Sequence, residues 1–270
     1  MPPPERPTVL VTGATGGLGR ATAGRLAELG TKVLVHGRSR ERAEAVVKEI
    51  GPASGAAQPF VADLSSLDEV RRLANEVEQA ADRLDVLVSN AGIIAERREL
   101  SADGHELTLA VNHLSHFLLT IRLLPLVRRS APARIVNVSS IGQSAIDFDD
   151  PMLERRYDAF RAYAQSKLAQ VMFTLELATR LRDEGEDGVT VNAVHPATLM
   201  ETKMVRNAFG RARSTVGEGV EAVVRLAVSD EVVGVSGRFF DGKCEAGVDR
   251  QALDPGARRR LWELSERLTR

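Results

Sequence analysis

A tyrosine and a lysine four residues apart, Tyr163 and Lys167, are the pair best suited to chemistry in this chain. Residues i and i+4 share one face of a helix, so the Lys167 ammonium would stand one turn from the Tyr163 phenol. A free tyrosine titrates near ~10, and a neighbouring cation favours the phenolate and lowers that pKa. Such a pair could exchange a proton with an alcohol or carbonyl oxygen. Because this spacing is common on helices by chance, the interpretation depends on the rest of the chain.

The stretch 8–30 supports that interpretation, because it is typical of a buried strand, a glycine-rich turn and a helix. Glycines let the backbone turn sharply and let a ligand approach without a Cβ in the way. The helix N-terminus behind them offers free N–H groups and a positive dipole end, which suits a pyrophosphate. The spacing is T-G-x-x-x-G-x-G, carried by Thr12, Gly13, Gly17 and Gly19. A glycine-rich turn without a ligand is the simpler alternative.

Strands and helices alternate along the chain, and this alternation predicts how the reactive residues are brought together. Short apolar runs predict strands at 8–12, 32–36, 59–62, 84–89, 134–139, 189–194 and 237–240. Helical spacing predicts helices at 20–29, 40–50, 66–81, 104–129, 157–182, 217–229 and 255–268, and 51–58 is predicted as a loop. Right-handed crossovers then give a doubly wound α/β fold with a mainly parallel sheet and helices on both faces. We expect its ligand at the carboxyl ends of the strands.

No change in composition divides the chain, so we interpret residues 1–270 as a single domain. A cofactor half would cover about 8–140, a catalytic and substrate half about 141–255, and a terminal helix 255–269. A net charge of −1 argues against nucleic acid or an acidic membrane surface as the main partner. The one cysteine, Cys244, excludes an internal disulfide framework and a cysteine-cluster metal site.

Two segments bear on membranes and localisation. The N-terminal MPPPERP lacks the apolar core of a signal peptide, so we expect a cytoplasmic protein. The most apolar segment, 107–127, is interrupted by polar residues such as Asn112, which favours a buried amphipathic helix over a membrane span. A polar Asn112 inside a helix is unfavourable and needs a reason. His113 and His116 have no acidic or cysteine partner at ligand spacing, so we expect core-edge histidines and no metal.

The residues after the second predicted strand bear on cofactor choice. In NAD-binding folds an acidic residue about 20 positions past the glycine loop binds the ribose 2′-OH, whereas an arginine accommodates a 2′-phosphate. Gly37 stands at the place of the acid, and Arg38 follows it. The pattern favours NADP(H), with NAD(H) as the alternative. The simpler interpretation is a solvated basic face, since Arg40 and Arg42 lie nearby.

Three further predicted strands end in residues that could meet a ligand. Asp-Leu at 63–64 follows the third strand, although Asp63 could instead cap the next helix. Asn-Ala-Gly at 90–92 ends the fourth strand, where small residues leave room for a cofactor backbone. Ser139 and Ser140 end the fifth, where a hydroxyl would point into the crevice.

In this order, the glycine loop, Asn-Ala-Gly, strand-end serine and Tyr-x-x-x-Lys resemble the short-chain dehydrogenase/reductase family, from about 8 to 240. The resemblance implies a seven-stranded Rossmann-like fold and an oxidoreductase that transfers a hydride between a nicotinamide and an alcohol/carbonyl substrate. It implies a catalytic tetrad of Asn112, Ser140, Tyr163 and Lys167. Tyr163 would be the general acid/base, and Lys167 would lower its pKa and hold the nicotinamide ribose. Ser140, favoured over Ser139, would bind the substrate oxygen, and the Asn112 backbone would hold a relay water.

The resemblance also implies that Asp63 contacts the adenine and that Asn-Ala-Gly lies beside the adenosine ribose. With the glycine loop, it assigns the cofactor to residues that mostly follow strands. They are Gly13, Thr15, Gly16, Gly17, Leu18, Gly19, Arg38, Asp63, Leu64, Asn90, Ala91, Gly92, Tyr163, Lys167, Pro196, Leu199 and Thr202.

The chain departs from the family pattern in two places. Ser140 and Tyr163 are 23 positions apart, more than in most members, and Asp-Phe-Asp-Asp at 147–150 lies between them. That insertion and Ser-Lys-Leu-Ala at 166–169 resemble the retinol-dehydrogenase-like branch, although we expect no membrane anchor here and the resemblance does not imply a retinoid. The second departure is His195-Pro196-Ala197 with Thr202, in place of Pro-Gly and an earlier threonine, and we interpret His195 as structural.

Other functions remain open at this point. A non-catalytic NADP(H) sensor or scaffold could use the same fold, and sugar-nucleotide epimerase chemistry would need a larger C-terminal domain. We expect a small-molecule substrate, a fairly apolar alcohol, ketone or aldehyde. Whether the chain forms a homo-oligomer is left open by the sequence. Segments 141–162 and 198–213 are predicted to form an apolar lid over the nicotinamide end. The motivating residues are Ile141, Ile146, Phe148, Met152, Leu199, Met200, Met204 and Phe209.

Overall fold

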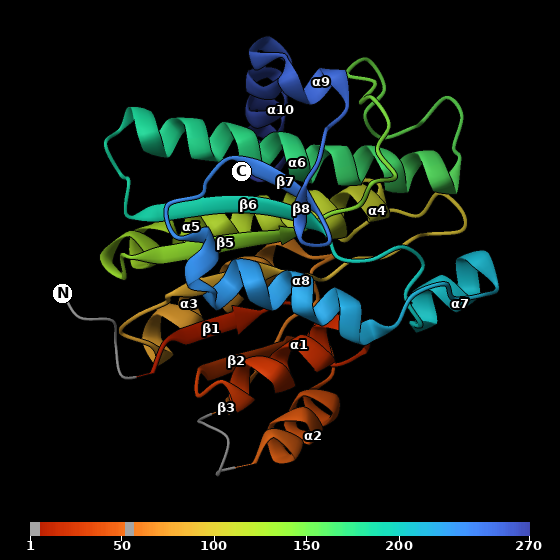
Figure 1. Cartoon of the computed structure of the whole chain (residues 1–270). Coiled ribbons are helices and arrows are strands. Elements are labelled where there is room, and N and C mark those ends of the chain that lie inside the picture. The colour runs from red at the N-terminus through yellow and green to blue at the C-terminus, as the bar shows by residue number, and fades with distance from the viewer. Residues whose placement is uncertain (1–5, 52–56) are drawn as a thin grey trace.

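A computed structural model describes residues 6–51 and 57–270, and within them one eight-stranded sheet runs through the molecule (Figure 1). Its order is β3-β2-β1-β4-β5-β6-β7-β8. The parallel strands are β1 (Thr8–Val11), β2 (Lys32–Gly37), β3 (Ala57–Val61), β4 (Val86–Ser89), β5 (Ala133–Val138), β6 (Val189–His195) and β7 (Arg238–Asp241). The order reverses between β1 and β4, which makes a crevice at their carboxyl ends. The doubly wound α/β prediction is confirmed.

The count of seven strands is wrong by one. A two-residue strand, β8 (Cys244–Glu245), pairs antiparallel with β7 after a turn at Gly242, whose φ is 57°. Both β8 residues are exposed, so no apolar pattern marks this strand in the sequence.

Alternate residues of each strand face opposite helical layers. Val9, Val11 and Val35 pack with α1 (Gly17–Glu28), α2 (Arg40–Ile50) and α8 (Val216–Val228). Leu10 and Leu34 pack on the other face with α3 (Leu67–Ala80), α5 (Ser115–Arg129) and α6 (Ala159–Asp183). Because both faces are covered, the strands are continuous apolar runs, as expected for a parallel sheet.

Several helices begin directly after a residue whose side chain caps the helix N-terminus. Ser39, Ser66 and Asp158 accept hydrogen bonds from backbone N–H groups three residues on, at the starts of α2, α3 and α6. Three short helices were not predicted, α7 (Lys203–Phe209), α9 (Arg250–Leu253) and η2 (Asp230–Val232). They have at most seven residues, too few to show a helical period. In the predicted loop 51–58, residues 57 and 58 belong to β3, and 52–56 lie outside the described residues.

The helix predicted at 104–129 is divided into three parts. It begins with α4 (Leu107–Leu109), passes through a π-turn η1 (Ala110–Leu114) around Asn112, and continues as α5. The π-turn gives the reason that a polar Asn112 inside the predicted helix required. This 107–129 segment is long and apolar enough to cross a membrane by length and composition, yet most of it is buried inside the fold.

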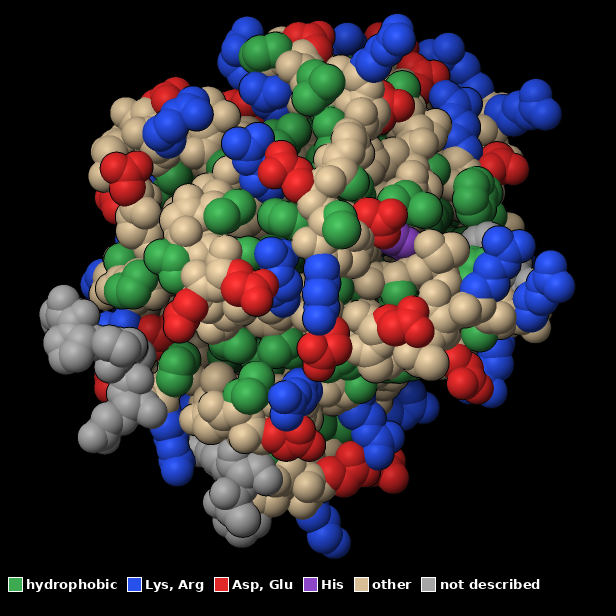
Figure 2. Space-filling model, viewed as in Figure 1, with side chains coloured by type: hydrophobic (Ala, Val, Ile, Leu, Met, Phe, Trp, Pro, Cys, Tyr) green, Lys and Arg blue, Asp and Glu red, His purple; other side chains and the backbone are tan. Residues whose placement is uncertain are grey.

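The C-terminal helix α10 (Pro255–Leu268) lies against α6 (Figure 1). The Trp262 ring stacks on Phe173 and meets Phe117 edge to face, with ring centroids 5.9 and 5.1 Å away. His113 Nε2 lies 2.8 Å from Ser265 Oγ. The chain's last helix thus packs on α6 and reaches Phe117 of α5 through Trp262. On the molecular face in Figure 2, acidic and basic side chains are interspersed and not gathered by sign.

Candidate active site

The glycine loop between β1 and α1 is built for close approach. A Cβ on Gly13, whose φ is +66°, would lie 2.9 Å from Ala91 Cα, and a Cβ on Gly19 would lie 2.4 Å from Gly13 O. Gly16 faces open space, and as N-cap of α1 it makes no side-chain cap bond. The first N–H groups of α1 therefore lie beside a large cavity, an arrangement that fits a pyrophosphate.

Thr12 holds this loop onto the end of β4. Its hydroxyl accepts hydrogen bonds from Asn90 N and Ala91 N at 2.8 and 3.0 Å, and Asn90 Nδ2 donates to Thr12 O at 2.8 Å. His116 Nδ1 lies 3.1 Å from Asn112 O, which can only accept, so Nδ1 carries a proton. Burial lowers the pKa of His116 to about 4, so the ring is neutral, and its Nε2 accepts from Thr12 Oγ1 at 3.0 Å.

His36 holds the same loop from β2. Its Nε2 lies 3.1 Å from Ala62 O and must donate there, while its Nδ1 accepts the Gly13 N–H at 3.2 Å. Burial lowers the pKa of His36 to about 4, which keeps the ring in this neutral form. Both histidines therefore fix the glycine loop, a role that was not predicted from the sequence. A histidine inside an apolar strand was the one available signal for His36.

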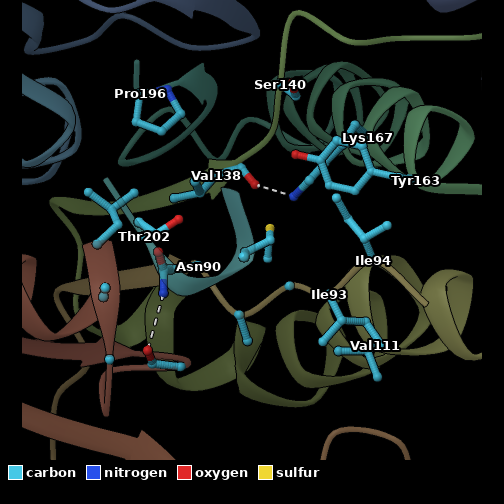
Figure 3. Close-up of a pocket in the computed structure, with 18 of the residues that line it drawn as sticks. Asn90, Ile93, Ile94, Val111, Val138, Ser140, Tyr163, Lys167, Pro196 and Thr202 are labelled. Carbon is cyan, nitrogen blue, oxygen red and sulfur yellow. Dashed lines mark hydrogen bonds between the residues drawn. The ribbon is translucent and has the colours of Figure 1, made fainter. Parts of the chain in front are cut away.

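Tyr163, Ser140 and Lys167 meet at the other end of the cavity (Figure 3). Lys167 Nζ lies 5.5 Å from the centroid of the Tyr163 ring. It donates to Val138 O at 2.9 Å and to Gln170 Oε1 at 2.8 Å. Burial lowers the pKa of Lys167 to about 7.

The pKa of Tyr163 is raised by burial, and its hydrogen bond with Ser140 acts in the opposite direction. The net shift is opposite to the lowering predicted from Lys167, because burial is the largest influence on the Tyr163 pKa. Ser139, the alternative to Ser140, donates its hydroxyl to Lys167 O at 2.7 Å. Of the two serines, Ser140 is the one that interacts with the phenol.

Asn112 is placed by its side chain. Its Oδ1 accepts from Ile93 N at 2.8 Å, and its Nδ2 donates to Ile93 O and to Ser166 Oγ. A Cβ on Gly92 would lie 3.4 Å from Asn112 Oδ1 and 3.6 Å from Lys167 Nζ. The loop that follows β4 is thus held between the π-turn and α6, next to the lysine.

Arg38 lines the opposite end of the cavity and is exposed, whereas Arg40 pairs with Glu44 at 3.7 Å. A Cβ on Gly37 would lie 2.3 Å from Thr15 Cγ2, so a side chain at this position would require Thr15 to move.

At the third strand end, Asp63 Oδ1 accepts from both Ser65 N and Ser65 Oγ in a local turn, whereas Ser66 is the N-cap of α3, so the alternative that Asp63 caps this helix is wrong. Asp63 and Leu64 nevertheless line the cavity.

After β6, Pro196, Leu199 and Thr202 all line the cavity. Leu199 has a φ of +50°, and its carbonyl accepts from Arg213 N at 2.9 Å. Thr202 caps α7 through Val205 N and lies beside Gly17. His195 Nε2 lies 3.0 Å from Thr198 Oγ1, a contact within its own loop.

The cavity measures about 760 Å³, and all the predicted cofactor contacts line it. Of the predicted catalytic tetrad, Ser140, Tyr163 and Lys167 line it, and Asn112 is not among the lining residues. Figure 3 places apolar side chains of Ile93, Ile94 and Val111 on the Tyr163 side.

The apolar residues of the two predicted lid segments, 141–162 and 198–213, divide between the cavity and the core. Ile141 and Phe160 line the cavity, as do Leu199, Met200, Met204 and Val205. Ile146 is instead buried in the core with Leu168 and Met172, and Phe148 packs against that cluster. The Met152 sulfur accepts the Glu106 N–H at 3.3 Å. The first predicted lid segment is therefore mostly packed down, and the Phe209 side chain lies outside the described residues.

The sequence profile described as short chain dehydrogenase matches residues 7–212. The chain belongs to that family. Retinol dehydrogenase 14 of Homo sapiens is 41% identical over 96% of this short-chain dehydrogenase and 85% of its own length. A solved structure from Mycobacterium paratuberculosis has 32% identity and a TM-score of 0.81, covering 99% of this chain and 95% of that one. The NADP complex of Pseudomonas aeruginosa RhlG has 29% identity and a TM-score of 0.70, covering 87% and 94%.

These similarities confirm a short-chain dehydrogenase/reductase of the retinol-dehydrogenase-like branch, an oxidoreductase that acts on CH–OH and C=O groups. Solved relatives hold NADP or NADPH, so a nicotinamide cofactor fits the glycine cradle of this dehydrogenase.

Proposed function

We propose that this dehydrogenase interconverts an apolar alcohol and its carbonyl compound, prefers NADP(H), and uses Tyr163 as its general acid/base. The observation that carries the proposal is the convergence of Tyr163, Ser140 and Lys167 in the cavity that also contains the glycine loop. A binding-only sensor would not need these three side chains together.

The chain's residues would divide the cofactor between them. The glycine loop and the α1 N-terminus would hold the pyrophosphate, Arg38 the 2′-phosphate, and Lys167 the nicotinamide ribose. When bound, the nicotinamide supplies or accepts the hydride. The protein would supply the proton and the hydrogen bond to the substrate oxygen.

In reduction, the Tyr163 Oη–H would donate its proton to the substrate oxygen, and in oxidation the phenolate would take it back. Ser140 would donate a hydrogen bond to the same oxygen as negative charge develops there. Since burial raises the pKa of Tyr163, the phenolate needs a positive charge nearby, and Lys167 is the cation closest to its ring.

Two observations support the finer parts of the proposal. Arg38 is exposed at the cavity and makes no ion pair with any described residue, whereas Arg40 is paired with Glu44. The substrate end is lined by Ile93, Ile94 and Val111, which favours an apolar substrate. The name of the human relative specifies retinol, which is an apolar alcohol.

Tyr163→Phe tests the catalytic role. It should keep the fold and NADPH affinity and lower turnover by about 10²–10⁴-fold, because it removes the hydroxyl that exchanges the proton and leaves the ring in place. The assay follows NADPH absorbance with a panel of apolar aldehydes and ketones. Tyr157→Phe is the matched control, because that hydroxyl donates to Ala95 O at 2.8 Å and does not line the cavity. Parental turnover in Tyr163→Phe would exclude the proposed acid/base.

A further inference from the structure

The Lys167 ammonium is held by two acceptors inside the protein. Its Nζ donates to Val138 O at 2.9 Å and to Gln170 Oε1 at 2.8 Å, and both side chains are buried. Val138 is on β5, whereas Gln170 lies three residues beyond the lysine on the same face of α6. An ammonium has three N–H donors, so one remains for the cavity.

We propose that Gln170 is a positioning residue for proton transfer, which keeps the Lys167 ammonium charged and fixed beside the Tyr163 phenol. The inference rests on the proposed function, because the proton concerned is the one that Tyr163 would exchange with substrate.

Packing alone does not account for a glutamine at this position. Gln170 is 1% exposed, and its Nε2 has no hydrogen-bond partner among the described residues. A buried amide donor without a partner destabilises the folded state, and an apolar side chain of similar size would avoid that cost. What the glutamine supplies, and a methionine would not, is the Oε1 acceptor for Lys167.

The electrostatic surroundings of Lys167 make that acceptor important. Burial lowers the pKa of Lys167 to about 7, and the described residues place no carboxylate in an ion pair with it. The titratable groups that face it are Tyr163 on α6, His116 on α5 and His195 on β6, and burial lowers the pKa of both histidines, which disfavours their charged forms. Only neutral oxygens therefore favour the charged lysine, and Gln170 supplies the one that belongs to a side chain.

Three variants separate this role from packing. Gln170→Met removes the acceptor at nearly constant size, and Gln170→Glu keeps an acceptor oxygen at the same reach. Gln165→Met is the control, since Gln165 is also a buried glutamine on α6, and its Oε1 accepts from Asp147 N at 3.1 Å. Thermal unfolding checks that all three variants fold.

The first measurement is the titration of Lys167 in the full chain, which has five lysines. With 13Cε-labelled lysine, the Lys167 NMR signal is the one lost in Lys167→Met. In Gln170→Met the pKa of Lys167 should fall by about one pH unit or more, because a hydrogen bond to the charged form is lost. It should rise in Gln170→Glu and stay parental in Gln165→Met. An unchanged titration in Gln170→Met would overturn the proposal.

The second measurement is the pH dependence of alcohol oxidation. Turnover near pH 7 should fall about 5-fold in Gln170→Met, because a fall of one unit from a pKa of about 7 lowers the charged fraction of Lys167 at pH 7 from about a half to about a tenth. The rise of the oxidation rate with pH should also move to higher pH, because Tyr163 loses the nearby cation that favours its phenolate. Gln170→Glu should restore turnover, and Gln165→Met should keep the parental profile. Parental turnover and profile in Gln170→Met would exclude a role in proton transfer. A parent chain with no turnover on any alcohol or carbonyl would overturn the proposed function and this role with it, while the lysine titration would still decide the pairing.

Discussion

Three buried histidines predict that the fold weakens steeply in mild acid. His36, His113 and His116 are at most 2% exposed, and burial lowers their pKa values to about 4, 3 and 4. In the unfolded chain a histidine titrates near ~6.5. Below that pH the histidines bind protons in the unfolded state but stay neutral in the folded state, so the free energy of unfolding falls as the pH falls.

The size of the effect follows from these values. The contribution is fully present above about pH 6.5 and is lost as the pH falls toward about 4. Between pH 7 and pH 5, each histidine should lower the free energy of unfolding by about 2 kcal/mol, and the three together should lower it by about 5–6 kcal/mol. The result depends little on the folded pKa, provided that it stays below ~4.5. Since domains have ~5–15 kcal/mol in total, this loss is large.

Urea unfolding at pH 7 and pH 5, followed by far-UV circular dichroism, measures the loss directly. Each of His36→Asn, His113→Asn and His116→Asn should reduce the pH-dependent loss by about 2 kcal/mol, whatever its stability at pH 7. His105→Asn is the control, because that ring is only partly buried. A parental loss under ~2 kcal/mol, or the parental loss in all three variants, would refute the reasoning.

Two further predictions concern the cavity. Arg38→Ala should weaken NADPH about 10- to 100-fold and leave NADH nearly unchanged, because one charge-assisted bond to the 2′-phosphate is lost. Arg40→Ala is the control, and fluorescence titration measures the affinity for each cofactor. If Arg38→Ala weakened the binding of NADPH and NADH equally, the phosphate site at Arg38 would be refuted. Amide hydrogen exchange should slow in 198–213 when NADPH and an apolar ligand are added, since this segment lines the cavity. Exchange in α2 should stay constant, and unchanged exchange in 198–213 would contradict a closing segment.

The fold was predictable wherever burial on both faces leaves a continuous apolar run. The strands 8–12 and 189–194 are examples, and their ends differ from β1 and β6 by one residue. Polar or short elements were missed, because Cys244 and Glu245 are exposed and α7 has only two turns. Their structure comes from pairing and capping contacts, which leave no period in the sequence.

The site was predictable as a set of residues but not as a network. Tyr163 and Lys167 were found from a local spacing, and the cavity brings them to the glycine loop. His36 bonds to Gly13 over 23 positions, and His116 bonds to Thr12 over 104. Such partners are set by tertiary packing, so residue type alone could not distinguish these histidines from ordinary core residues. The direction of the Tyr163 pKa shift was mispredicted for the same reason, since the burial of the phenol was unknown.

The long-range hydrogen bonds of the Thr12 hydroxyl bear on the order of events during protein synthesis. Its partners Asn90, Ala91 and His116 lie 78, 79 and 104 residues further along the chain. A ribosome that has released only the first strands and the glycine loop has therefore not yet made the groups that hold the loop in shape. Affinity for a dinucleotide should emerge late during synthesis, after α5 has left the exit tunnel, and an isolated N-terminal fragment that ends before β4 should not bind one.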